Sequence, residues 1–196
     1  MIRTAVIDPD FLALPLDRLA DAALAVAKAR GATYADFRIE RLRSQTIVAR
    51  DRELETSVEG ESVGFSLRVV CKGAWGFASG VDLTTDAVAS VAHRAANVAE
   101  ALAPLNAEPV TLADEPAYTD TYVSLYDVDP FTVAEDEKIG FLLVLNERAL
   151  ASKLIDRVTS HVSLVREQKY FASLAGSRIT QQRVRVKGDL TAVRID

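Results

Sequence analysis

Residues 63–80 read VGFSLRVVCKGAWGFASG, and their alternating apolar positions are the clearest structural signal in the sequence. In an extended chain one face would carry Val63, Phe65, Leu67, Val69 and Cys71, because successive side chains of a strand point to opposite sides. Lys72-Gly73 then supplies a tight turn, and a second apolar run follows from Ala74 to Ser79. The stretch therefore predicts an antiparallel hairpin, with Cys71 as a small buried side chain rather than a reactive thiol.

Helical patterns flank this hairpin on both sides. Residues 16–30 repeat apolar side chains at the spacing of an amphipathic helix, and Gly31 follows where a left-handed cap is needed. Thr84 and Thr85 can cap a second helix, which Pro104 ends. Alternation from Tyr34 onward indicates several antiparallel strands between them. The sequence thus predicts an α+β fold of two layers, with antiparallel sheets packed against helices.

In the second half of the chain, a predicted helix is again followed by predicted strands. Thr132 and Glu135 have the spacing of a capping box for a helix that continues to Leu150. Strand alternation then resumes in two runs, from Val158 to Leu164 and from Gln168 to Leu174. Before this helix, residues 104–131 hold four of the six prolines and no sustained period, which is typical of a linker. Side chains that could hold the linker against a neighbouring surface are Tyr118, Tyr122, Leu125 and Tyr126.

We therefore expect two subdomains in tandem, at residues 1–103 and 132–196, joined by the linker at residues 104–131. The last residues still have strand-like sequence. This pattern favours a second subdomain that is truncated at its end, although a terminal edge strand would look the same.

Composition limits the classes of partner. The net charge is −5, so the sequence predicts neither nucleic-acid binding nor attraction to an anionic membrane. A single cysteine and no long apolar run favour a cytoplasmic protein without disulfides. Near the end of the chain, a group of basic residues is a local exception to the net negative charge: Arg178, Arg183, Arg185, Lys187 and Arg194. The middle three would share one face of a strand, as a solvated surface or as a partner-binding patch.

Catalytic chemistry has few candidates here. A hydrolytic metal needs several converging ligands, and the two histidines, His93 and His161, have no useful neighbours in the sequence. The glycine-rich run from Gly73 to Gly80 matches neither a phosphate-binding loop nor a dinucleotide fingerprint, so its glycines are expected to let a hairpin bend or another backbone approach. We predict no catalytic, metal-binding or cofactor-binding residue in this chain, and its substrate-binding residues stay unknown.

Acidic residues are also explained without catalysis. They include Glu53, Glu55, Glu59 and Glu61, and the group Glu135, Asp136 and Glu137. Paired carboxylates act as acid and base only in a pocket that shifts their pKa values, and the sequence shows no such pocket. The second group belongs in the first turn of a helix, where the helix dipole favours negative charge.

The order of several motifs resembles the amino-terminal half of the TldD/PmbA family, also called modulator of DNA gyrase. The motifs are YADFRIE at 34–40, GFSLRV at 64–69, GAWGFA at 73–78, DPF at 129–131, EKI at 137–139 and FASLAGS at 171–177. GAWGFA is the most specific of them. The resemblance covers nearly all of the chain after the first helix.

The resemblance implies a zinc metallopeptidase whose His-Glu-x-x-x-His motif lies in the carboxy-terminal half, and no such motif occurs here. It also implies a homodimer or a heterodimer with another family member, around a cavity that receives peptide substrates. We therefore expect a scaffold portion that is inactive alone, with zinc only in the full-length protein. Two alternatives remain open: a free-standing dimerisation or interaction module, and a PmbA-like partner that lacks the metal.

Overall fold

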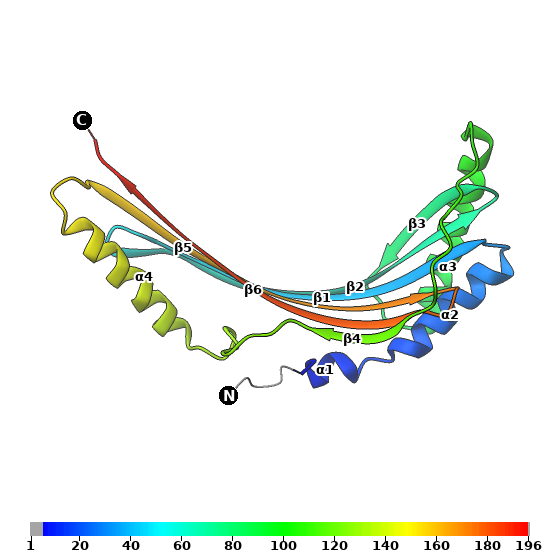
Figure 1. Ribbon diagram of the computed structural model, residues 1–196, viewed down its shortest axis with the longest axis horizontal. Coiled ribbons are helices and arrows are strands. Elements are labelled where there is room, and N and C mark those ends of the chain that lie inside the picture. Colours follow the sequence, from blue (N-terminus) through cyan, green and yellow to red (C-terminus); the bar gives the residue numbers. More distant parts are fainter. Residues whose placement is uncertain (1–5, 196) are drawn as a thin grey trace.

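In the computed structural model, which describes residues 6–195, one continuous sheet runs the length of the molecule (Figure 1). Within those residues it has six strands in the order β3-β2-β1-β5-β6-β4. Their bounds are β1 Tyr34–Arg50, β2 Glu53–Cys71, β3 Ala74–Gly80, β4 Thr119–Val123, β5 Arg157–Ser173 and β6 Arg178–Val193. β4 runs parallel to β6, and the other pairings are antiparallel. The expected α+β class, with helices packed on a mostly antiparallel sheet, is confirmed.

The helices cover only one face of the sheet. Figure 1 shows the sheet bent into an arch, with α2 (Leu16–Ala29) and α4 (Glu135–Leu150) under its convex side. α3 (Thr85–Leu102) packs on the same face, since the β1 residues buried under helices all have odd numbers. The short α1 (Pro9–Leu12) adds buried Phe11. The opposite, concave face carries no helix among the described residues.

The sheet has two unlike ends. At one end α2 and α3 pack on residues 34–40 and 65–71, and we call this the helix-pair end. At the other end α4 packs on residues 46–50 and 158–164, and we call this the single-helix end. The core of the helix-pair end is large and includes Leu19, Phe37, Leu67, Val88 and Ala95, whereas three residues, Ile47, Ala49 and Leu142, form the buried cluster described at the single-helix end.

Both hairpin and helices agree with the predictions from sequence. Lys72 and Gly73 adopt φ of 53° and 76°, the left-handed conformations that a tight hairpin turn requires. The side chain of Thr84 accepts a hydrogen bond from the backbone N–H of Ala87, and Gly31 follows α2 with φ of 72°. Cys71 is buried, as expected. None of the helices formed by residues 6–195 is both long and apolar enough to cross a membrane.

The strands are longer than the alternation indicated. β1 and β2 pair in one ladder from Tyr34 to Arg50, and β5 is a single strand where two runs were expected. In the middle of the sheet both faces are polar, so no apolar burial pattern marks the strand there, and backbone hydrogen bonds and ion pairs such as Arg43–Glu59 maintain it. Strands of this length cannot stay flat, because each has a right-handed twist, and the sheet therefore curves.

One local prediction was wrong. Thr132 and Glu135 do not form a capping box, because α4 begins at Glu135 after Ala134, without a side-chain cap. The Thr132 hydroxyl donates instead to the backbone oxygen of Asp129.

The linker side chains lie partly against the sheet. The Tyr122 ring contacts Arg183, and Tyr126 lines a hollow with Gln182, whereas Tyr118 and Leu125 are more than half exposed. Backbone pairing also holds residues 119–123 as β4.

The division into two subdomains remains a prediction. Strands from both proposed halves share the same sheet, because β1 and β5 are hydrogen-bonded neighbours from Asp36 to Arg50. The region predicted as a linker contains a 3-10 turn, η1 (Ala103–Leu105), and β4. The segment between them crosses the helix-pair end, where Val110 donates its N–H to the backbone oxygen of Gly73.

Candidate functional site

The polar groups with metal-binding chemistry are dispersed. Residues 6–195 contain no group of three or more His, Cys, Asp or Glu side chains placed to hold a metal ion. His93 is exposed on α3, with its Nδ1 3.4 Å from a guanidinium nitrogen of Arg30. His161 lies on the concave face, with its Nδ1 3.4 Å from Asp189 Oδ2. The described residues therefore do not fit a hydrolytic metal.

Cys71 has no nucleophilic character. Its side chain is 1% exposed, and burial, followed by the nearby negative charge of Glu100, raises the pKa of its thiol. A raised pKa leaves the thiol protonated near neutral pH, so the thiolate required for nucleophilic attack is absent.

The glycine-rich run places a helix against the sheet. A Cβ added at Gly76 would lie 1.9 Å from the backbone oxygen of Ala95 in α3, and one at Gly80 would lie 2.8 Å from the Phe65 ring. The expected approach of another backbone at this run is confirmed. β3 therefore carries its two large side chains, Trp75 and Phe77, on the concave face, where they are partly exposed.

Asp36 organises the concave face at the helix-pair end. Only 1% of Asp36 is exposed, and its carboxylate accepts hydrogen bonds from Arg38 Nε at 2.9 Å and Arg68 Nε at 2.8 Å. The Tyr34 hydroxyl also donates to it at 2.9 Å. The hydrogen bond to Asp36 raises the pKa of Arg68. One buried carboxylate thus holds two cations whose outer surfaces face the concave side.

Aromatic rings surround these two guanidinium groups. The Arg68 guanidinium lies 5.5 Å from the centre of the Trp75 ring, and Arg38 lies 5.4 Å from that of Phe171. Tyr34 meets Trp75 edge to face, with ring centres 5.7 Å apart. Between these rings and the segment at residues 110–118 is a hollow of about 820 Å³. Aromatic and cationic groups at such distances attract one another, which keeps this wall ordered.

A second charged network continues along the same face. Glu167 accepts hydrogen bonds from Lys169 Nζ at 2.7 Å and from Arg185 at 2.6 Å, and Lys169 also contacts Glu40 at 3.1 Å. Burial by itself would raise the pKa of Glu167, but the bonds from Lys169 and Arg185 together outweigh it, and the pKa is lowered. The carboxylate is therefore ionised at neutral pH and holds both cations.

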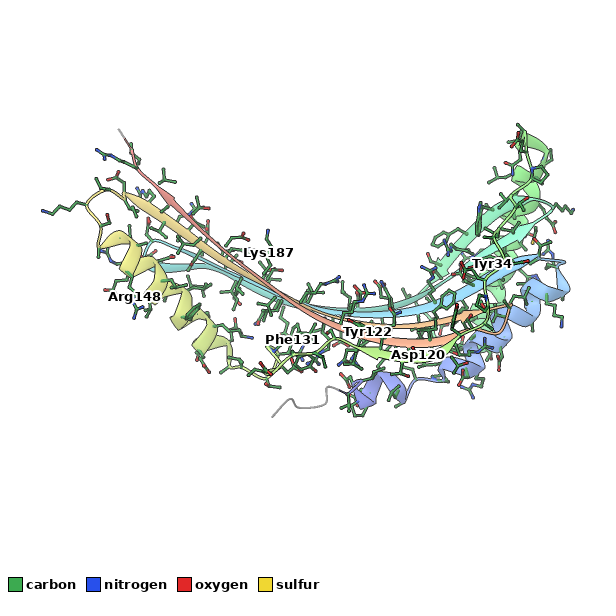
Figure 2. The ribbon with its side chains drawn as sticks, viewed as in Figure 1. Tyr34, Asp120, Tyr122, Phe131, Arg148 and Lys187 are labelled. Carbon is green, nitrogen blue, oxygen red and sulfur yellow. The ribbon has the colours of Figure 1, made fainter. Side chains whose placement is uncertain are left out.

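The middle of the convex face is closed by the Asp-Pro-Phe motif. Figure 2 shows Phe131 on the segment that precedes α4. Its ring lies 4.8 Å from the Arg43 guanidinium and 5.0 Å from that of Arg166. Asp129 pairs with Arg166 and accepts the backbone N–H of Phe131. This motif therefore has a structural role, since it fastens the segment before α4 to the polar centre of the sheet.

Two strand segments have no neighbour on their outer side among the described residues. β3 pairs with residues 65–71 of β2, which leaves residues 53–64 at one edge of the sheet. β4 pairs with residues 178–182 of β6, which leaves residues 185–193 at the opposite edge. Exposed apolar side chains on these open edge segments are Leu54, Val58, Val63, Val186, Leu190 and Val193. Their backbone N–H and C=O groups are available to another strand.

The predicted basic residues divide between the two faces. Arg178 lies on the convex face and pairs with Asp21 at 2.9 Å, whereas the middle three share the concave face, as expected. Of these, Arg185 pairs with Glu167, Lys187 with Asp189, and Arg183 lies over the Tyr122 ring at 5.9 Å.

The acidic run of β2 pairs mainly with β1 arginines, such as Glu61 with Arg41 and Glu59 with Arg43. Asp36 was not predicted as a site residue. The signal in the sequence that could have indicated it is an acidic residue between the apolar residues Ala35 and Phe37.

Comparisons with known proteins agree with the expected family. Residues 35–99 match the family model described as PmbA/TldA metallopeptidase domain 1. A curated relative named metalloprotease MJ0996, from Methanocaldococcus jannaschii, is 25% identical over 146 residues, which cover 74% of this chain and 32% of the relative. The chain therefore spans about a third of the length of that relative.

Solved structures share the fold at low sequence identity. A candidate modulator of DNA gyrase from Thermotoga maritima has a TM-score of 0.68 at 16% identity, over 92% of this chain and 40% of its own. A similarly described protein from Bacteroides thetaiotaomicron has a TM-score of 0.66 at 20% identity, over 90% and 40%. TldE from Thermococcus kodakarensis has a TM-score of 0.60 at 13% identity, over 90% and 43%. The resemblance inferred from the motifs is confirmed in two respects: residues 35–99 match the model of the first PmbA/TldA metallopeptidase domain, and the fold is shared with the three solved structures.

Proposed function

We propose that this chain is a non-catalytic, peptide-guiding portion of a TldD/PmbA-type metallopeptidase that acts on small or unfolded peptides. The observation that carries the proposal is the one-sided sheet: within residues 6–195 its helices cover the convex face, the concave face carries no helix, and two edge segments have no neighbouring strand. The hydrolytic metal of the peptidase is then held by residues other than those described, since residues 6–195 offer no ligand set for it.

The edge segments supply the chemistry for binding an extended peptide. A peptide that adds to a sheet edge is held by main-chain hydrogen bonds, which do not depend on its side chains. Residues 53–64 and 185–193 offer such edges, while the compact core of the helix-pair end keeps the rest of the sheet in place. Recognition through the backbone suits a peptidase that accepts many unfolded sequences.

The same proposal includes a dimer with a second family member, identical or related. The single-helix end supports it, because α4 exposes Phe141 and Val144, and the nearby edge of β6 exposes Val186 and Leu190. Phe141 and Leu190 line one hollow between α4 and the sheet. Apolar groups gathered at one end of a molecule are typical of a surface that another protein covers.

Peptides with methylated backbones test the role of the edges. A fluorescent unstructured peptide is titrated with the purified chain, and so is the same peptide N-methylated at alternate residues. We expect methylation to weaken binding at least about tenfold, because it removes the donors that a sheet edge requires. Equal binding of the two peptides would exclude strand addition. Zinc bound in a stoichiometric amount, together with peptide cleavage by the chain alone, would contradict the non-catalytic role.

The alternative is a free-standing dimerisation module without a peptide ligand. The exposed apolar side chains at the single-helix end favour it as well, since they need only a partner surface. Sedimentation with and without peptide separates the two functions: a module of this kind dimerises through its apolar end and leaves the peptide free in solution.

A further inference from the structure

The concave face gathers cations from four strands. They are Arg38, Arg68, Lys169, Arg183, Arg185 and Lys187, and carboxylates that pair with them are Asp36, Glu40, Glu167 and Asp189. Other acidic residues border this face elsewhere: Asp114 and Glu115 line the hollow beside Trp75, and Asp120 of β4 pairs with Ile179. The place where cations outnumber carboxylates is therefore local.

Each buried carboxylate on this face is shared between two cations. Asp36 receives Arg38 and Arg68, and Glu167 receives Lys169 and Arg185. A guanidinium group has five N–H donors, and one carboxylate satisfies only some of them. Arg38 and Arg185 remain 44% and 55% exposed in their side chains, so their other donors can reach a ligand.

Arg183 is a further exposed cation on the concave face, nearer the middle of the sheet. It is exposed, and within residues 6–195 its contact is the Tyr122 ring rather than a carboxylate. Together with Arg38 and Lys169 it lines a trough of about 690 Å³ on the concave face. Three cations from β1, β5 and β6 thus border one hollow, and Glu40 is the carboxylate among its lining residues.

We propose that the concave face selects peptides with acidic side chains at alternate positions, which the cations bordering this trough recognise. This inference rests on the proposed function and names the substrate class for it. In an extended peptide every second side chain points the same way, so alternate carboxylates meet the cations while the intervening residues point away. Carboxylates bind guanidinium and ammonium groups through charge-assisted hydrogen bonds.

Nucleic acid fits the same face less well. A nucleic acid presents closely spaced phosphates, and the four carboxylates interspersed among the cations would repel a continuous row of them. The charge of the whole chain opposes such binding too. An oligonucleotide is therefore the competing ligand in the test.

The test compares two labelled peptides of about ten residues, one with Glu and one with Gln at alternate positions, a length that spans a typical strand. The Glu peptide is expected to bind the full chain about tenfold more tightly at low salt, because charged groups attract across a partly desolvated surface. The double variant Lys169→Gln/Arg183→Gln, which changes two of the three cations lining the trough, should remove most of that preference. A control with the same loss of charge, Arg148→Gln/Lys153→Gln, should keep it, since neither residue lines the trough and Figure 2 shows Arg148 on α4.

The outcomes are distinct. Equal binding of the two peptides overturns the acidic preference and leaves the proposed peptide-guiding function standing. Binding of neither peptide overturns both. Loss of the preference in both double variants would indicate a general charge effect rather than a site on the concave face. Tighter binding of a single-stranded oligonucleotide than of the Glu peptide would also contradict the assignment.

Discussion

The two ends of the sheet share strands but differ in what covers them. At the helix-pair end, α2 and α3 bury an apolar face of β1, β2 and β3, and the Gly76 backbone lies directly against α3. At the single-helix end, α4 covers a smaller cluster centred on Ile47, Ala49 and Leu142. There the buried side-chain oxygens of Asn146 and Ser160 have no hydrogen-bond partner within the described residues. Burial of apolar area is the main source of stability, so the helix-pair end should be the more stable.

Under the proposed function, this difference gives the two ends separate roles. A dense core tolerates few changes and fixes the shape of the sheet, whereas exposed edges and apolar groups at the other end would receive partners. Regions that bind and move are drawn from the less stable parts of a protein. Variants at each end test this division.

Gly76→Ala should be the most damaging single change. The new Cβ would meet the backbone of α3, which cannot move away without separating from the sheet, and we expect a loss of about 4 kcal/mol in the free energy of unfolding. The matched control is Gly60→Ala at the single-helix side, where no atom lies within 4 Å of the added Cβ. Urea denaturation measures both. Similar losses for the two variants would show that the close contact with α3 is not the cause.

Leu67→Ala and Leu142→Ala compare the two cores directly. Leu67 is fully buried among residues of the helix-pair end, and its truncation should cost about 3 kcal/mol. Leu142 is 4% exposed in the smaller cluster, where neighbours can collapse into the space, so about 2 kcal/mol is expected. Hydrogen exchange adds a local readout: Leu142→Ala should accelerate exchange in α4 and leave α3 unchanged. An equal acceleration in both helices would mean that the sheet unfolds as one unit.

Glu167 links the two ends through the concave face, and its effect should depend on pH. Its pKa is lowered in the folded protein from an ordinary value of 4.5, so the stabilisation is complete above pH 4.5 and is lost as pH falls below it. Glu167→Gln should lower the free energy of unfolding by about 1 kcal/mol at neutral pH, because Lys169 and Arg185 lose their shared partner. The difference between wild type and variant should shrink in acid. If the difference in free energy of unfolding between wild type and Glu167→Gln stays constant from neutral pH to acid, ionisation of Glu167 does not contribute to stability.

Sequence patterns predicted the helix-pair end far better than the rest. Residues 16–30, the hairpin at Lys72-Gly73 and the helix capped by Thr84 all carry a burial pattern, and burial is what periodicity records. β4 was missed because Thr119–Val123 is an almost fully exposed strand held by its backbone, which leaves no apolar alternation. The central parts of β1 and β5 were interrupted in the prediction for the same reason.

The candidate site was less predictable because it depends on register. Arg68 reaches Asp36 across the β1–β2 ladder, 32 residues away in sequence, and Arg185 reaches Glu167 across the β5–β6 ladder. Alternation could place Arg183, Arg185 and Lys187 on one face, but the carboxylates opposite them follow only from the pairing of the strands. A capping pattern at Thr132 was misleading, because α4 begins only at Glu135 and Ala134 occupies the cap position.

The smallest effect on stability is expected at the exposed face of α4. Phe141 is 62% exposed, so Phe141→Ser should change the free energy of unfolding by no more than about 0.5 kcal/mol. If this face docks a second molecule, the same change should weaken concentration-dependent association in sedimentation velocity, because it removes an apolar anchor. Phe77→Ser is the matched control, since Phe77 is 56% exposed at the opposite end of the sheet. Association that responds to Phe77 and not to Phe141 would reverse the roles of the two ends.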